Sequence, residues 1–409
     1  MLRISTLWAG LPGLLMSVSL ITAISLPAQA EDAPIRIGII GPFTGKSSTD
    51  MGESIRGGAQ VFLQDINQIG GVMGRRIELV ERDDQAKPDI GVALAKELVE
   101  KEKVVAVVGF ANTGVALPSA KIFQDGKVPL IISAATGAAI TKQFMPPAMQ
   151  NSYIFRLAAS DNLQPSVILN DVIDKRKLTQ IAVLHDDSPY GQFGKDNLLA
   201  ELLRRKMTPV AVESFKVGDQ DMSAQLAKAK QAGAQIVVLY CLSTEAAMVA
   251  NNMNKARMNI PLTGSWTLSQ RSFMELAGNN AEGARMPVTF IENESSNRSS
   301  SFVSNYLRIN NVKSIPSAVA AAQTYDALRI LTLALMQANS TEGEKIRLAL
   351  EDMKYDATST VISRYKKPFS KTDHEAVAQN MIFIGEIRRG HVGYAYKEDA
   401  NSSLIVRTK

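Results

Sequence analysis

Val128-Pro129-Leu130-Ile131-Ile132-Ser133-Ala134-Ala135-Thr136-Gly137 joins a strongly apolar run to a set of small residues and one threonine. The apolar part predicts a buried strand over residues 128–133, and the residues after it predict the start of a helix. Free backbone N–H groups and the Thr136 hydroxyl beyond such a strand suit an anion, because helix N-termini carry unpaired donors and a positive dipole end. The simpler interpretation is that Thr136 only caps the helix, and the segment alone favours it.

The same alternation of short apolar runs and amphipathic stretches recurs along the chain, which predicts βα units and mostly parallel sheets. The first series has expected strands at 35–40, 77–81, 104–109, 128–133 and 153–157, and expected helices at 54–68, 89–101 and 114–125. The second has expected strands at 181–184, 210–215, 236–240, 261–264 and 288–291, and expected helices at 191–206, 222–232 and 244–256. Further helices are expected at 301–310, 318–337 and 344–353, before a hairpin of 381–387 and 391–396. Two α/β units in tandem account for this pattern.

The first thirty residues have the pattern of a cleaved export signal. Arg3 supplies the positive start, residues 11–26 are largely apolar, and Ala28-Gln29-Ala30 forms a small-x-small cleavage site. A membrane anchor is the alternative, but serines and a threonine interrupt the apolar stretch, which is short for a spanning helix. We therefore expect a signal peptide over residues 1–30 and a periplasmic location. The remaining length favours two domains.

Charge and cysteine content argue against several classes of protein. The 45 Lys and Arg residues and the 40 Asp and Glu residues are scattered along the chain, so no nucleic-acid-binding patch is predicted. Cys241 is the only cysteine, so an intramolecular disulfide is impossible despite the export signal. It follows the apolar run 236–240 and is expected to be a small buried residue rather than a nucleophile.

Two motifs for catalysis or metal binding begin in this sequence and remain incomplete. Gly41-Pro42-Phe43-Thr44-Gly45-Lys46-Ser47 has too few residues between its glycines for a phosphate-binding loop. His374-Glu375 begins like a zinc-protease motif, but Ala378 stands where the second histidine belongs. Asp186-Asp187 is a carboxylate pair, but neighbours in an extended segment point to opposite sides. The sequence therefore predicts a binding protein that is not an enzyme and that needs no metal ion or cofactor.

A series of short motifs indicates a family. In chain order they are Phe43-Thr44-Gly45, Gly70-Gly71-Val72 with Gly74, Asp83-Asp84, Val108-Gly109, Pro118, Pro129, Ala134-Ala135-Thr136, His185-Asp186 with Tyr190-Gly191, and Glu282-Gly283. Each motif alone is weak. Their order and spacing over nearly the whole chain resemble the leucine/isoleucine/valine-type substrate-binding proteins of bacterial ABC transporters, which are type I periplasmic binding proteins.

The resemblance implies an α/β fold of two Rossmann-like lobes with mostly parallel sheets, joined by a three-segment hinge, with the ligand cleft between them. Lobe 1 would comprise mainly residues 31–157 and lobe 2 mainly residues 158–291, while residues 292–409 would supply crossovers and complete both lobes. The resemblance also implies a monomer that traps a solute by hinge closure and passes it to ABC permease and ATPase subunits at the inner membrane. A soluble sensory receptor that feeds a chemoreceptor or kinase is the alternative.

Members of the resembled family hold the ligand with hydroxyl residues and a backbone carbonyl. The positions that match are Thr113 and Thr136 for the ligand carboxylate, and the Ala134 carbonyl for the ligand ammonium. Tyr190 matches the family's tyrosine at the cleft, with a core tyrosine as the alternative. Beside Thr113, the segment that ends at Gly137 is better interpreted as half of a carboxylate clamp than as an ordinary helix cap.

The chain departs from the family where the ligand ammonium is bound. Trp266 stands where amino-acid-binding members carry an acidic residue. Ser243 is a weaker candidate contact where they often carry an aromatic residue, and Met51 replaces another usual aromatic. A buried ammonium without a partner is costly, although an indole offers cation–π attraction. The sequence therefore favours a small carboxylate-bearing solute, such as an aromatic or other organic acid on which Trp266 stacks, with an ordinary amino acid as the alternative.

Overall fold

The structure is a computed structural model that describes residues 33–292 and 297–402. The signal peptide predicted for residues 1–30 lies outside this range. Within it, no helix combines the length and the hydropathy needed to span a membrane. These residues also contain no cluster of three or more His, Cys, Asp or Glu side chains able to hold a metal ion.

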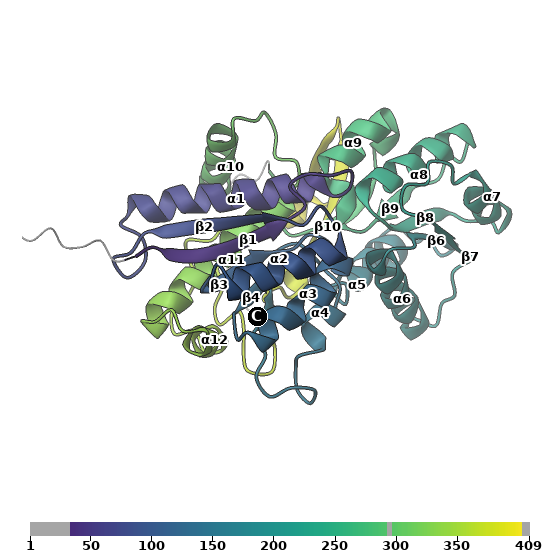
Figure 1. Cartoon of the computed structure of the whole chain (residues 1–409). Helices are drawn as coiled ribbons and strands as arrows, with labels where there is room; N and C mark the ends of the chain where they lie inside the picture. Colours follow the sequence, from purple (N-terminus) through teal and green to yellow (C-terminus); the bar gives the residue numbers. More distant parts are fainter. Residues whose placement is uncertain (1–32, 293–296, 403–409) are drawn as a thin grey trace, which may run out of the picture. The chain divides into compact units, whose positions relative to one another are not determined.

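The first lobe is built on a parallel sheet of five strands in the order β2-β1-β3-β4-β5. Its strands are β1 (Ile35–Gly41), β2 (Ile77–Asp83), β3 (Ala106–Gly109), β4 (Leu130–Ile132) and β5 (Ile154–Arg156). The helices of this part of the chain are α1 (Thr49–Gln68), α2 (Pro88–Glu100), α3 (Thr113–Asp125) and α4 (Ala139–Lys142). In Figure 1, α1 lies along β1 and β2. Every residue of β3, β4 and β5 is buried, as expected for parallel strands covered on both faces.

The second lobe is built on a sheet of seven strands in the order β12-β11-β10-β9-β8-β6-β7. The five parallel strands are β6 (Ile181–Asp186), β7 (Ala211–Phe215), β8 (Ile236–Tyr240), β9 (Leu262–Gly264) and β10 (Arg285–Val288). The antiparallel strands are β11 (Phe383–Arg388) and β12 (His391–Tyr394). The α-helices are α5 (Gln164–Leu169), α6 (Pro189–Arg204), α7 (Ser223–Gln231), α8 (Ser243–Lys255), α9 (Arg271–Ala277) and α13 (Lys397–Ser402). Shorter segments are a π-helix, η1 (Asn170–Lys175), and the 3₁₀ helices η2 (Trp266–Ser269), η3 (Gly278–Ala281) and η4 (Gln379–Met381).

The chain passes between the two lobes three times. It leaves the first sheet after β5, returns after β10 to form α10 (Asn297–Asn310), α11 (Ala318–Ala338) and α12 (Gly343–Glu351), and crosses again to form β11. The alanine-rich α11 packs closely on α1, where a Cβ on Gly58 would lie 2.4 Å from the carbonyl oxygen of Ala321. The predicted fold class, with two α/β lobes of mostly parallel sheets, is thus confirmed.

Several predicted elements differ from the observed ones. The strand expected at 288–291 is wrong, because β10 begins at Arg285 and ends at Val288. Proline is uncommon inside a sheet, yet Pro287 pairs with Ile384 in the antiparallel ladder. The helices α4, α5, α9 and α13 were not predicted, since they are too short to show a helical period. Cys241 is buried, as predicted.

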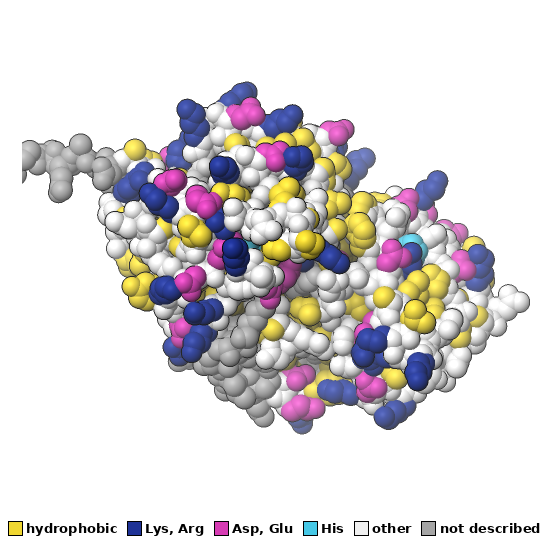
Figure 2. All heavy atoms as spheres, turned by 90° about the horizontal axis from the view of Figure 1, so that it is seen from below, with side chains coloured by type: hydrophobic (Ala, Val, Ile, Leu, Met, Phe, Trp, Pro, Cys, Tyr) yellow, Lys and Arg dark blue, Asp and Glu magenta, His cyan; other side chains and the backbone are white. Residues whose placement is uncertain are grey.

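Basic and acidic side chains lie among one another on the molecular face shown in Figure 2. No large area of one sign is visible on this face. The scattered charges of the sequence therefore stay scattered here after folding.

Stability is expected to fall as the pH rises from 4 to 8, because of carboxyl groups such as that of Asp84. This side chain is fully buried, its Oδ1 accepts a hydrogen bond from Ala86 N at 2.8 Å, and its Oδ2 has no partner among the described residues. Burial, more than the neighbouring Asp83 charge, raises its pKa from 3.8 to about 7. Between these values the folded chain binds more protons than the unfolded chain, so raising the pH destabilises the fold.

The variant Asp84→Asn is expected to show a smaller drop in melting temperature between pH 5 and pH 8 than the parent protein. Asp186 shifts in the same direction, to about 6, so part of the drop remains. Asp89→Asn, at an exposed position of α2, is the matched control and should leave the profile unchanged. Identical pH profiles for Asp84→Asn and the parent protein would contradict the assignment.

Candidate functional site

The predicted clamp lies beyond the carboxyl ends of β3 and β4, which are neighbours in the first sheet. Thr113 is the first residue of α3, and its Oγ1 accepts a hydrogen bond from Gly137 N at 3.2 Å. The helix after β4 begins at Ala139 and has Ala138 at its N-cap, so Thr136 does not cap it. The simpler interpretation of Thr136 as a helix cap is therefore wrong, and the turn is free for another role.

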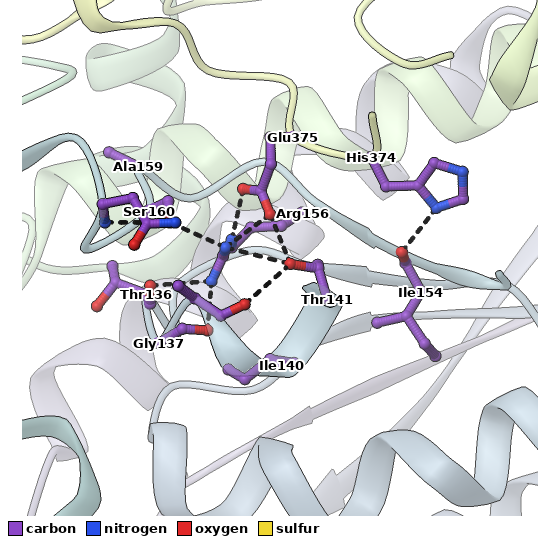
Figure 3. A network of polar contacts seen from close by, with 12 residues as sticks. Thr136, Gly137, Ile140, Thr141, Ile154, Arg156, Ala159, Ser160, His374 and Glu375 are labelled. Carbon is purple, nitrogen blue, oxygen red and sulfur yellow. Dashed lines mark hydrogen bonds and ion pairs between the residues drawn. The ribbon is translucent and has the colours of Figure 1, made fainter. Parts of the chain in front are cut away.

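Arg156 holds the backbone of this turn in place by hydrogen bonds to its carbonyl oxygens. Its side chain is 1% exposed, and Nη1 donates to the carbonyl oxygens of Thr136 at 2.9 Å and Gly137 at 2.7 Å. Its remaining N–H groups bind the carboxylate of Glu375, at 2.6 and 2.8 Å, and the hydroxyl of Ser160, as Figure 3 shows. The charge of the guanidinium is thus neutralised by the Glu375 carboxylate.

His374, the start of the incomplete zinc-protease motif, is part of the same framework. Its Nδ1 lies 2.9 Å from the carbonyl oxygen of Ile154, and its ring stacks on Phe155 with the centroids 3.9 Å apart (Figure 3 shows the contact with Ile154). Its Nε2 lies 3.3 Å from Glu351 Oε1. These contacts give His374 a structural role.

Buried polar atoms without a hydrogen-bond partner gather where the two lobes meet. Of the fourteen such atoms among the described residues, seven belong to residues near this junction: Asn112 Oδ1, Thr136 Oγ1, Asp161 Oδ2, Tyr190 Oη, Tyr240 Oη, Trp266 Nε1 and Gln323 Oε1. Such atoms are rare in folded proteins, because each costs free energy unless a protein group, water or ligand satisfies it. Their concentration in one place indicates a site for a polar ligand.

Two cavities are lined by five of these residues, and Asp161 and Tyr240 line neither of them. The larger has a volume of about 570 Å³, and Thr113 and Gly114 of α3 line it opposite Pro189 and Tyr190 of α6. Lys46, from the incomplete phosphate loop, also lines it. The smaller measures about 10 Å³ and is lined by Thr136, Gln164, Trp266 and Gln323 among others. A volume of that size holds about one water molecule, so a solute there requires the lobes to separate.

Tyr190 is held by the start of α6. Asp186 Oδ1 accepts hydrogen bonds from the backbone and side chain of Ser188, while its Oδ2 accepts one from Leu242 N at 2.9 Å. Ser188 caps α6 by accepting a hydrogen bond from Gly191 N. Asp186 therefore shapes the turn before Tyr190. Tyr190 is 6% exposed, and its ring lies 5.8 Å from that of Tyr240.

Trp266 also faces the lobe junction. It opens η2 just after β9, its side chain is 5% exposed, and its backbone N–H donates to Gln164 Oε1 at 3.3 Å. Since Gln164 lies in α5 just after the first crossover, this bond joins the end of the crossover to the β9 end of the second sheet.

Three other predicted contacts line neither cavity. Ala134 is fully buried, and Met51 is 2% exposed in the core. The hydroxyl of Ser243 pairs with that of Ser272 at 2.7 Å. The structure thus places Thr113, Thr136, Tyr190 and Trp266 around the two cavities, and all seven residues stay predictions as ligand contacts.

Comparison with known proteins identifies the family. The sequence model of the family described as "Periplasmic binding protein" matches residues 34–391. The chain belongs to this family. The resemblance to type I periplasmic binding proteins of the leucine/isoleucine/valine type is thereby confirmed.

Relatives of this periplasmic binding protein include the Leu/Ile/Val-binding protein homolog 3 of Brucella melitensis, which is 28% identical over 86% of this chain and 94% of its own. Among solved structures, LivJ of Streptococcus pneumoniae, a branched-chain amino acid transporter substrate binding protein in complex with isoleucine, has a TM-score of 0.74. It is 25% identical and covers 88% of this chain and 97% of its own. A type 1 periplasmic binding protein of Bordetella pertussis has a TM-score of 0.78 at 23% identity, covering 88% and 99% of the two chains.

Two residues of the candidate site of this periplasmic binding protein were missed by sequence reasoning. Arg156 ends β5, and Asp161 follows in the small-residue segment Ala158-Ala159-Ser160-Asp161. A carboxylate just beyond a strand end is the kind of signal used for Thr136, so Asp161 was recognisable in principle. Its burial was not, because it depends on side chains distant in sequence, such as Tyr240, whose pKa the Asp161 charge raises.

Proposed function

We propose that this protein binds a small carboxylate-bearing solute between its lobes and delivers it to ABC permease and ATPase subunits at the inner membrane. The observation that carries the proposal is the buried, unpartnered Oγ1 of Thr136. It sits on a turn whose backbone is fixed by Arg156 and whose Gly137 N–H is already held by Thr113. A hydroxyl donor kept free at a strand end is suited to an oxyanion.

Hinge closure would complete the site. Thr113 and Thr136 come from the first lobe, whereas Tyr190 and Trp266 come from the second. A solute that contacts both sets stabilises the closed arrangement by the difference in its affinity for the closed and open states. The isoleucine complex of LivJ supports binding of a carboxylate-bearing solute in this fold.

A thermal-shift screen of amino acids, aromatic acids, amides and short aliphatic acids tests the proposal. We expect at least one carboxylate to raise the melting temperature without being chemically changed, since ligand that binds only the native state stabilises it. Thr136→Val should weaken the binding of that solute about 10-fold, because a hydrogen bond to a charged group is lost. Thr136→Ser keeps the hydroxyl and serves as the control.

The transport role has a separate test. Cells that lack this protein should lose uptake of the solute found in the screen.

Two outcomes of the binding measurements would contradict the proposal. Unchanged affinity in Thr136→Val would overturn the site, and stabilisation by amides but by no carboxylate would overturn the ligand class.

A further inference from the structure

We propose that Lys46 and Lys87 bind a second acidic group of the solute, so that the solute is a dianion such as a dicarboxylate. This inference deepens the proposed function and rests on it, because it requires the first carboxylate at the turn of Thr113 and Thr136. It gives a role to Lys46, which lies in the incomplete phosphate loop.

The cavity of about 570 Å³ is lined by positive charge alone. Its lining includes Lys46 and Lys87, and none of the described residues that line it is Asp or Glu. On the face shown in Figure 2, by contrast, basic and acidic side chains lie among one another. A cavity whose charges have one sign attracts ions of the opposite sign, because its walls exclude part of the screening water. This cavity therefore favours an anion.

Neither lysine has a counter-ion among the described residues. Lys46 forms no ion pair there, and Lys87 Nζ donates to the neutral Gln85 Oε1 at 3.1 Å. Asp89 is close to Lys87 in sequence but neither pairs with it nor lines the cavity. Asp50 is close to Lys46 in sequence but pairs with an arginine of α9. An acidic group of the solute can supply the negative charge that the cavity lacks.

Asp83 joins the two loops that carry these lysines. Its Oδ1 accepts hydrogen bonds from the backbone N–H groups of Phe43, Thr44 and Gln85, at 2.9, 3.2 and 3.1 Å. Its Oδ2 accepts one from the Thr44 hydroxyl. The Asp83 carboxylate thus holds both loops in one wall of the cavity and is already occupied by their donors.

The wall that carries the lysines adjoins the position of the first carboxylate. Ser48, two residues after Lys46, accepts a hydrogen bond at 2.8 Å from Nδ2 of Asn112, the residue before Thr113. Thr113 itself lines the same cavity as both lysines. The volume of this cavity lies within the range typical of sites for small organic ligands. A solute with one acidic group at Thr113 therefore has room for a second at the lysines.

The rest of the cavity wall adds to the attraction for an anion. The helices α2, α3 and α6 begin in it, at Pro88, Thr113 and Pro189, and the N-terminal end of a helix carries partial positive charge. Tyr190 lines the cavity from the second lobe, is 6% exposed, and has no hydrogen-bond partner for its hydroxyl among the described residues. Both lobes thus offer groups that suit a dianion between them.

Calorimetry with matched pairs of probes tests the inference. The pairs are succinate with butanoate, glutarate with pentanoate, adipate with hexanoate, and terephthalate with 4-methylbenzoate. In each pair a methyl group replaces one carboxylate. We expect at least one dicarboxylate to bind about 10- to 100-fold more tightly than its partner, because its second carboxylate gains charge-assisted hydrogen bonds.

Substitution of the lysines shows whether they cause this preference. Lys46→Met and Lys87→Met should each reduce it about 10-fold, whereas Lys87→Arg keeps the charge and should retain most of it. Lys96→Met, at an exposed position of α2 that does not line the cavity, is the matched control and should keep it in full. The preference should also shrink as salt is added, because both lysines are exposed and their charges are screened.

The outcomes separate this inference from the proposed function. Equal or tighter binding of the monocarboxylates, or an unchanged preference in the double variant Lys46→Met/Lys87→Met, would overturn the inference and leave the proposed function standing. Failure of every dicarboxylate to bind, when a monocarboxylate from the thermal-shift screen does bind, would do the same. Binding of no carboxylate of either kind would overturn both.

Discussion

Replacing Arg156 with methionine is expected to lower the free energy of unfolding by about 3–5 kcal/mol, the typical cost of removing one partner of a buried ion pair. The guanidinium is 1% exposed and satisfies the carbonyl oxygens of Thr136 and Gly137 as well as the Glu375 carboxylate. Methionine fills much of the volume but leaves these acceptors without a donor. For a chain of this size the melting temperature should fall by roughly 5–10 °C, which calorimetry measures directly.

Arg204→Met is the matched control for this prediction. Arg204 forms an ion pair with Glu201 of the same geometry, at 2.6 Å, but its side chain is 68% exposed. Its removal should leave the melting temperature unchanged, because water replaces the lost contact. If Arg156→Met and Arg204→Met have the same melting temperature, the buried ion pair stabilises the protein no more than the exposed one. Glu375→Gln provides an independent check, since it leaves the Arg156 cation buried without its counter-ion and should also destabilise the protein.

The sequence predicted those parts of the fold that local pattern controls. The run 236–240 coincides with β8, and α1 was expected only from residue 54, because Thr49 to Glu53 show no apolar period. The family resemblance named Thr113 and Thr136, and the contact between Thr113 and Gly137, which was not predicted, arises because β3 and β4 are neighbours with their carboxyl ends at one edge. Each of these inferences uses one strand and the residues directly after it.

The missing parts of the site depend on contacts between distant segments. Arg156 meets Glu375, which is 219 positions away, and Trp266 N meets Gln164 across 102 positions. The sequence around Arg156 or Gln164 does not show whether the side chain is buried with a partner or exposed to solvent. For Asp161 the same holds, so its burial became visible only in the folded structure.

Enlarging Gly114 is expected to abolish lobe closure and weaken solute binding at least 100-fold. Gly114 is the second residue of α3, and a Cβ at this position would lie 3.3 Å from Cγ of Pro189, the first residue of α6 in the other lobe. A leucine side chain in Gly114→Leu would overlap the proline ring. It would also oppose the bond from Ser272 N to Asp50 Oδ2 at 2.7 Å, which joins the lobes elsewhere.

The expected effect falls on binding and not on folding. Leucine favours a helix over glycine by somewhat less than 1 kcal/mol, so the variant should melt no lower than the parent protein. The solute would keep its first-lobe contacts and lose those from Tyr190 and Trp266. The loss of these contacts should reduce the binding free energy by about 3 kcal/mol, which is about 100-fold in affinity. Small-angle scattering should show that the decrease in radius of gyration caused by solute in the parent protein is absent in Gly114→Leu.

Two variants separate closure from other effects of the substitution. Gly114→Ala needs Pro189 to shift by only a few tenths of an ångström and should retain most of the affinity. Lys121→Leu places the same side chain on an exposed position of α3 and should bind as the parent protein does. Parent-like affinity in Gly114→Leu would mean that the solute is held by one lobe alone, and Tyr190 and Trp266 would then have to be removed from the site. If the affinity falls slightly in Gly114→Ala, strongly in Gly114→Leu and not in Lys121→Leu, then it depends on the distance between α3 and α6.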